Sequence, residues 1–178
     1  MVLPISHLPP QNPNSFCRHQ FNKIKHPGNY SGIYSPMALE IESHRAGAEV
    51  VNGDGVCRKR SVELLEELGL PKGLLPLEDI EEFGYNRQDG FMWLVQRKKK
   101  VEHTFKKIKQ TVSYASEVTA FAEKGKLKNI AGVKTKELFL WLSVVEVYVP
   151  VSSPEKVTFK TGTGLSDSFD ATAFALGE

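Results

Sequence analysis

The sequence predicts a mainly β domain of the α+β class: a curved antiparallel sheet or β-barrel with one or two N-terminal helices packed against it. The first observation is a nearly uncharged run at residues 136–149, rich in β-branched and aromatic side chains. The second is a series of strand-like segments separated by short turns after residue 78. The third is that both helix-like segments precede these strands, an order typical of α+β domains.

Composition divides the chain at residue 37. Residues 1–36 contain no Asp or Glu and hold six of the ten prolines, whereas residues 37–178 carry 20 basic and 21 acidic side chains. A segment like the first does not bury enough apolar surface to offset the entropy of ordering it. We therefore expect residues 1–36 to be a disordered extension, dispensable for folding, and residues 37–178 to form a single domain. No apolar run reaches the roughly 18 residues of a membrane-spanning helix.

Two helices are expected at the start of the domain. Residues 37–51 contain aliphatic side chains near helical spacing, and the Asn-Gly-Asp-Gly segment at 52–55 ends that pattern. A second helix can begin at Asp54, a capping residue, and end at Gly69, which tolerates the left-handed conformation. Its apolar face consists of Cys57, Ser61, Leu64, Leu65 and Leu68.

The later segments are predicted to be strands. The Asn-Arg-Gln-Asp-Gly segment at 86–90 can form a hairpin loop between the first two of them. The run at 136–149 is apolar on both faces of a pleat, so both faces should be covered, and we expect the second helix to dock on its outer face. The expected strands span residues 79–86, 91–98, 101–108, 111–122, a short segment ending at 130, 136–149, 156–161 and 166–175.

The sequence contains few residue patterns that indicate a metal, cofactor or phosphate site. Cys17 and Cys57 lack the spacing of a disulfide framework or a zinc site, and the glycine-rich segments lack the context of a phosphate-binding loop. We therefore predict no metal site and no cofactor.

No catalytic constellation is recognisable either. The Gly-Leu-Ser-Asp-Ser segment at 164–168 differs from the GxSxG nucleophile motif in its last residue and precedes a strand rather than a helix. His103 is the only histidine of the β region. A weak carboxylic-ester hydrolase using Ser113, Ser166 or His103 is the enzymatic alternative, and a non-enzymatic role is favoured over it.

One charged feature stands above the background. Seven basic side chains concentrate on two neighbouring predicted strands and the turn between them: Arg97, Lys98, Lys99, Lys100, Lys106, Lys107 and Lys109. Such a patch can hold a phosphate, a carboxylate or an anionic lipid headgroup. The alternative is that the lysines protect an exposed sheet edge. Nucleic acid is not expected as a partner, because the folded part is close to neutral and contains no recognition-helix or aromatic RNA-binding pattern.

The predicted strands also carry more aromatic surface than a small barrel needs. Two arrangements are open: the aromatic side chains close a packed core, or they line a cavity that takes an acyl chain or a flat ring. In the second arrangement the lysines hold an anionic head. The candidate ligand-binding residues are Trp93, Phe105, Phe121, Phe139 and Trp141, with Lys98, Lys99, Lys100, Lys106 and Lys107.

From about residue 37 to its end, the chain resembles the plant family called domain of unknown function 538. The resemblance rests on the segments at 64–86, 90–105, 112–121 and 132–141, which include the loop Gly-Leu-Pro-Lys-Gly-Leu-Leu-Pro. Within the family, the chain is similar to the subgroup that includes the trichome protein named "smaller with variable branches". Near the C-terminus, Asp167 and Asp170 depart from the family pattern, which has Arg and Pro at these places.

The resemblance implies a barrel-like β domain with helices at its amino end, comparable to lipid-binding bactericidal/permeability-increasing proteins. Family members have been linked to chlorophyll binding, ester hydrolysis, stress responses and trichome growth, but no catalytic residues carry over. The leading hypothesis is a non-enzymatic binder of a lipid or a chlorophyll-like pigment inside the barrel. A stress- or development-related interaction protein without a small ligand is a further alternative. We expect a monomer in the cytoplasm rather than the chloroplast, with an anionic membrane surface as a candidate partner.

Overall fold

The computed structural model describes residues 35–177. The predicted disordered extension, with Cys17, therefore lies outside the described residues except for its last two positions. These two belong to the first helix, α1 (Pro36–His44), because Ser35 is its N-cap and accepts a backbone hydrogen bond on Oγ at 3.0 Å. The described helix thus begins just before Met37, where the domain is predicted to start.

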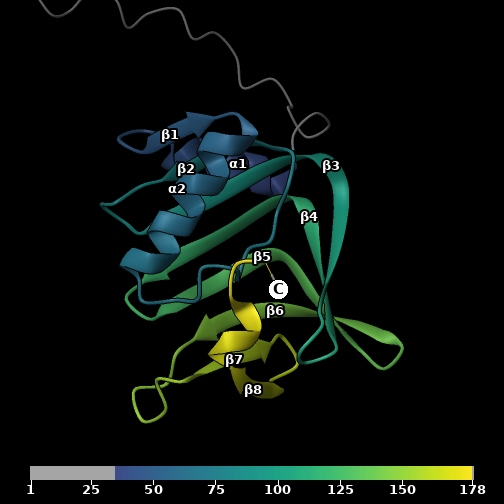
Figure 1. Ribbon diagram of the computed structural model, residues 1–178. Helices are drawn as coiled ribbons and strands as arrows, with labels where there is room; N and C mark the ends of the chain where they lie inside the picture. Colours follow the sequence, from purple (N-terminus) through teal and green to yellow (C-terminus); the bar gives the residue numbers. More distant parts are fainter. Residues whose placement is uncertain (1–34, 178) are drawn as a thin grey trace, which may run out of the picture. The chain divides into compact units, whose positions relative to one another are not determined.

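Eight strands form one antiparallel sheet in which each strand pairs with its neighbours in sequence (Figure 1). This meander, with one helix before β1 and a second between β1 and β2, confirms the predicted mainly β fold. In the hydrogen-bonded order of the described strands, β1 and β8 are the two edges, so the sheet is curved and open. The strands are β1 (Glu49–Asn52), β2 (Ile80–Tyr85), β3 (Phe91–Phe105), β4 (Gln110–Glu123), β5 (Lys126–Glu137), β6 (Leu140–Tyr148), β7 (Lys156–Thr161) and β8 (Ser166–Asp170).

The predicted first helix at 37–51 is wrong in its second half. Helix α1 ends at His44, Gly47 takes a positive φ of 79°, and the chain continues into β1. Val50 and Val51 are β-branched and pair with β2, where an extended backbone suits them better than a helix. Tertiary pairing therefore outweighs the aliphatic spacing that suggested one longer helix.

The second predicted helix is present as α2 (Asp54–Glu67), but its N-terminus is built differently. Gly53 occupies the N-cap position with a φ of 91°, and Asp54 is the first helical residue. The Asp54 carboxylate accepts a hydrogen bond from the backbone N–H of Ile80 at 3.1 Å, which ties the helix to β2. Asp54 thus joins two elements rather than capping one.

Two strand predictions also need correction. The segment expected at 91–98 and the first part of the one expected at 101–108 form one long strand, β3, which ends at Phe105. Its pairing with β4 shifts register between Val95 and Lys100. The last strand stops at Asp170 instead of continuing to 175. There the Asp170 side chain caps a short 3-10 helix, η1 (Ala171–Phe174).

The nearly uncharged run at 136–149 is not a single strand. Strand β5 ends and β6 begins within it, so that Leu138 and Phe139 form the turn of a hairpin. Leu138 adopts a φ of 55°, and the two side chains are 88% and 96% exposed. The prediction that both faces of this run are covered is wrong at its start. Within β6, burial on the inner face begins only at Val144.

The hydrophobic core has two parts, one on each face of the sheet. The larger part lies between the sheet, α2, the loop at 70–77 and η1. The smaller part brings Ile41 of α1 against Phe91 and Trp93. Helix α2 packs against β1 and β2, so the predicted docking on the run at 136–149 is also wrong.

The carboxylate of Glu82 is hydrogen-bonded to the smaller cluster. Glu82 accepts a hydrogen bond from Trp93 Nε1 at 2.8 Å and two from the Arg45 guanidinium at 2.9 and 3.1 Å. Burial acts to raise the pKa of Glu82, but the hydrogen bonds from Arg45 and Trp93 outweigh it and hold that pKa below its ordinary value. The ionised carboxylate therefore links α1 to the sheet.

This link predicts a pH-dependent contribution to stability. Because the pKa of Glu82 is lower in the folded than in the unfolded chain, its contribution is present above about pH 4.3, the ordinary value for Glu, and is lost as the pH falls through the folded value. When the pH is lowered from neutral to acidic, we expect the free energy of unfolding, measured by urea titration, to fall less in Glu82→Gln than in the wild type. The same pH dependence in both proteins would contradict this assignment.

Candidate functional site

The interior of the curved sheet is packed. Two spaces lined mainly by core side chains measure about 30 and 20 Å³, room for one or two water molecules each. The first surrounds Tyr114, whose hydroxyl donates a hydrogen bond to the Leu74 carbonyl at 3.2 Å. Of the two arrangements left open by the sequence, the structure has the packed core.

A groove of about 730 Å³ opens instead on the surface beside α2. It is bounded by α2, the loop at 73–78, the end of β3 and the C-terminal residues 175–177. This volume falls in the usual range for small-molecule sites. Its apolar lining comes from Val62, Leu75, Pro76, Leu77, Phe105 and Leu176, and its ionisable lining from Arg58, Lys59, Glu63, Glu78 and His103.

The groove depends on a close contact between two segments far apart in sequence. The Gly73 N–H donates a hydrogen bond to the Phe174 carbonyl at 2.9 Å, which fixes the loop against the C-terminal segment. A Cβ at Gly73 would lie 2.6 Å from the Ala175 carbonyl oxygen, so this approach requires glycine. On the opposite wall, Lys59 and Glu63 stand one helical turn apart and face the same side of α2.

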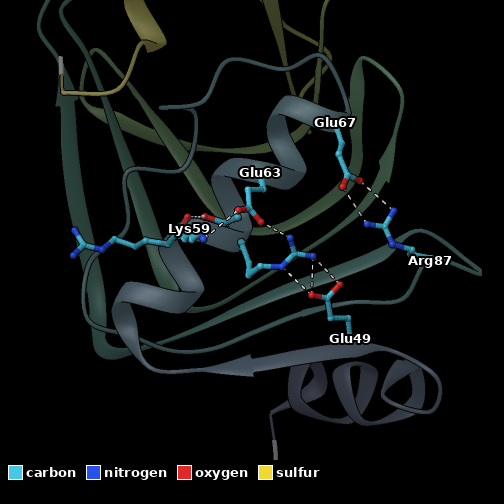
Figure 2. A network of polar contacts seen from close by, with 8 residues as sticks. Glu49, Lys59, Glu63, Glu67 and Arg87 are labelled. Atoms are coloured by element: carbon cyan, nitrogen blue, oxygen red, sulfur yellow. Dashed lines mark hydrogen bonds and ion pairs between the residues drawn. The ribbon is translucent and has the colours of Figure 1, made fainter.

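Charges on this face of α2 are mostly paired. Arg60 binds both Glu49 of β1 and Glu63, and these two glutamates are labelled in Figure 2. Further along the helix, Glu67 pairs with Arg87 (Figure 2). Because Glu63 is held by Arg60, the Lys59 ammonium has only a long contact with it, 3.9 Å between Nζ and Oε1. Lys59 is thus a loosely held cation on the groove wall.

His103 supplies a titratable group in the opposite wall. Its ring packs edge-on against Phe105, with 4.7 Å between the ring centroids. Burial lowers the pKa of His103 below its ordinary value, and the charge of Lys106 lowers it further. The imidazole is therefore neutral at pH 7 and can donate one hydrogen bond and accept another.

The serines predicted for the hydrolase alternative do not meet this histidine. Ser113 is buried in β4, and Ser166 is exposed at the start of β8. Among residues 35–177, no serine is hydrogen-bonded to His103. A serine esterase needs a base within hydrogen-bond reach of its nucleophile, so no observation in the structure favours hydrolysis.

The aromatic residues predicted to bind a ligand are distributed over three places. Trp93 and Phe121 belong to the cluster beneath α1. Phe105 belongs to the larger core and also lines the groove. Phe139 and Trp141 lie at the exposed hairpin between β5 and β6. The structure therefore does not bring the five aromatic side chains together in one cavity.

The lysines predicted to bind a ligand also lie at different places in the structure. Lys98 pairs with Asp79 at 3.0 Å, and Lys99 is exposed. Lys100 lies over the Trp141 ring, 4.8 Å from its centroid, and pairs with Glu102 at 2.6 Å.

The remaining two lysines occupy the turn between β3 and β4. Lys106 is exposed there, and its charge acts on His103. Lys107 donates a hydrogen bond to the Thr172 carbonyl at 3.2 Å. Lys106 is thus the predicted lysine whose charge reaches the groove.

Sequence reasoning missed most of the groove. Leu75, Leu77 and Leu176 come from a loop and the C-terminal segment, which periodicity does not describe. The one available signal is the dense Gly and Pro content of the loop at 69–76, which marks a fixed backbone shape. Nothing in the sequence indicates that this loop and the C-terminal segment meet.

Two kinds of feature are not found in the described part of the chain, a metal-binding cluster and a membrane-spanning helix. No three His, Cys, Asp or Glu side chains within residues 35–177 cluster so that they could hold a metal ion. No helix in the same range has the length and apolarity needed to cross a membrane.

The comparisons with known proteins give a family but no function. Residues 61–175 match the family model described as "Protein of unknown function, DUF538". No curated protein and no solved structure matches the chain. The matched range includes the loop at 73–78 and, of the C-terminal residues that bound the groove, Ala175.

Proposed function

Because the chain belongs to the DUF538 family, whose description states no activity, we propose from the site itself that the domain binds an amphipathic small molecule without transforming it. The observation that carries this proposal is the groove of about 730 Å³, which joins an apolar wall to a few ionisable side chains. A groove with convergent polar groups and a titratable residue of shifted pKa is the usual mark of a ligand site.

The arrangement of the lining suggests the chemistry of the ligand. Leu75, Leu77 and Leu176 offer an apolar surface to a hydrocarbon chain or a ring. Lys59 and His103 can receive a polar or anionic head, because the Lys59 ammonium is loosely held and the imidazole can gain a proton. A fatty acid, an acidic lipid or a carboxylated pigment has both parts.

A pair of substitutions on the same helix tests the groove. Val62 lines it, whereas Val56 is 51% exposed on α2 and does not. Val62→Trp should fill the groove and weaken binding of oleate by at least about tenfold, or about 1.4 kcal/mol, as measured by calorimetry. Val56→Trp should bind like the wild type. Equal affinities for all three proteins, or no binding by the wild type, would refute the proposal.

A proton titration adds a second, independent readout. A bound carboxylate near the imidazole should raise the pKa of His103, because it stabilises the imidazolium. We expect oleate to shift the His103 resonance titration toward higher pH in NMR spectra, with the resonance assigned by its loss in His103→Gln. An unchanged titration with saturating oleate would place the head of the ligand elsewhere.

A further inference from the structure

The hairpin between β5 and β6 exposes three consecutive large apolar side chains. Leu138, Phe139 and Leu140 are 88%, 96% and 66% exposed, at a turn that extends beyond the rest of the sheet in Figure 1. Single exposed apolar residues are ordinary on protein surfaces, but a contiguous group marks an interaction site. We call these three residues the apolar tip.

Basic and aromatic side chains stand directly behind the apolar tip. Trp141 is half-buried and lies opposite Lys136 in the β5–β6 register. The ammonium groups of Lys100 and Lys136 lie 4.8 and 5.9 Å from the centroid of the Trp141 ring. Lys134 is on the same face of β5, two residues before Lys136. No acidic side chain among residues 35–177 forms an ion pair with Lys134 or Lys136.

A lysine-rich turn, between β3 and β4, lies at the same end of the sheet. Gln110, just after the β3–β4 turn, donates hydrogen bonds of 2.9 Å each to the carbonyl of Lys136 and to the carboxylate of Glu137. These bonds place the turn at 106–109, with the sequence Lys-Lys-Ile-Lys, beside the hairpin. Residues 37–178 carry one more acidic than basic side chain, so the positive charge at this end is local.

We propose that this end of the sheet docks the domain on the surface of an anionic lipid membrane. The apolar tip enters the boundary between headgroups and acyl chains, and Lys134, Lys136 and Lys100 contact the phosphates around it. Trp141 sits at headgroup depth, where its amphipathic ring is preferred. Each lysine near an anionic membrane adds to the attraction, and the apolar side chains add a part that salt does not screen.

The size of the tip favours a membrane over a protein partner. A stable interface between two proteins buries about 800 Å² on each partner, more than three residues at the end of a hairpin provide. A bilayer needs no shape-matched surface and accepts a narrow wedge. The surrounding lysines fit its phosphates, whereas they would repel one another across a contact between two copies of this chain.

The test compares substitutions at the two ends of the sheet in the full chain. Phe139→Ser should lower co-sedimentation with vesicles of phosphatidylcholine and phosphatidylserine by at least about tenfold. Val151→Ser is the matched control, because Val151 is fully exposed in the turn at the opposite end of β6. The control should bind like the wild type.

Charge is tested in the same way. The double variant Lys134→Gln/Lys136→Gln should lose about tenfold or more, whereas Lys124→Gln/Lys156→Gln, at the opposite end of the sheet, should bind like the wild type. Vesicles of pure phosphatidylcholine should bind all proteins weakly. No preference for the anionic vesicles, or equal losses in test and control variants, would overturn the proposal.

Two further readouts measure the depth of insertion and the oligomeric state. Lipids brominated on the acyl chain should quench Trp141 fluorescence in the bound protein, and Trp141→Phe should remove that quenching. An unquenched Trp141 would overturn insertion of the tip.

Light scattering should give a monomer for the wild type and for Phe139→Ser. A wild-type dimer that Phe139→Ser converts to a monomer would assign the tip to a second copy and overturn the membrane proposal. Val62→Trp should leave vesicle binding unchanged, so this inference and the groove proposal fail independently.

Discussion

Replacing Gly84 with alanine should destabilise the domain by about 3 kcal/mol or more, one of the largest effects expected from a single methyl group. Gly84 of β2 lies directly opposite Trp93 of β3, and the fully buried indole occupies the space beside the Gly84 backbone. A Cβ there would come within 2.0 Å of the ring. The ring cannot retreat, because Ile41 and Arg45 pack over it from α1.

Urea titration measures the loss of stability. Two further variants test whether it comes from the clash between the new methyl group and the Trp93 ring. Gly55→Ala, in α2, meets no atom within 4 Å and should be neutral or stabilising by up to about 1 kcal/mol. The double variant Gly84→Ala/Trp93→Leu should lose less than the sum of its single losses, because the smaller side chain leaves room for the methyl group. Additive losses would show that the destabilisation does not come from the ring.

Leu65→Ala should destabilise the domain by about 2 to 4 kcal/mol, because it leaves a cavity in the larger core. Leu65 is 1% exposed on the inner face of α2, and its carbonyl accepts the 2.8 Å hydrogen bond from the Leu70 N–H that ends the helix. Other residues of the same helix line the groove. Loss of this packing should therefore also weaken ligand binding at temperatures near the melting point.

The control for this prediction lies two residues further along α2. Glu67→Ala removes an exposed ion pair with Arg87, and such pairs contribute about 0 to 1 kcal/mol. Both variants are compared by urea titration with the wild type. Equal, small losses for Leu65→Ala and Glu67→Ala would show that α2 is not held by its apolar face.

Local chemistry determined those parts of the fold that depend on neighbouring residues alone. The segment at 156–161 has alternating β-formers between turn residues, and it is β7 with the same bounds. Gly69 takes the expected positive φ just after α2, and Gly90 takes one at the β2–β3 hairpin. At both glycines, the local backbone conformation requires that residue type.

The site residues were less predictable, because the type of an apolar or aromatic residue does not indicate whether its side chain faces the core or the solvent. Phe139 and Trp93 both belong to apolar strand-like segments, yet one is 96% exposed and the other is fully buried. What separates them is the turn at Leu138, whose positive φ falls on a residue that rarely adopts it. No glycine or asparagine marks that turn, so the residue pattern there is that of one continuous strand.

The class of the fold and the positions of most strands and of α2 could be predicted from the residue pattern, because they follow from propensity and periodicity. The tertiary structure decided that the core is packed, that β1 replaces half of the first predicted helix, and that Gly73 brings the loop and the C-terminal segment together. These outcomes depend on contacts between residues distant in sequence. Such contacts are set by the space left after all the elements have packed, which no local pattern encodes.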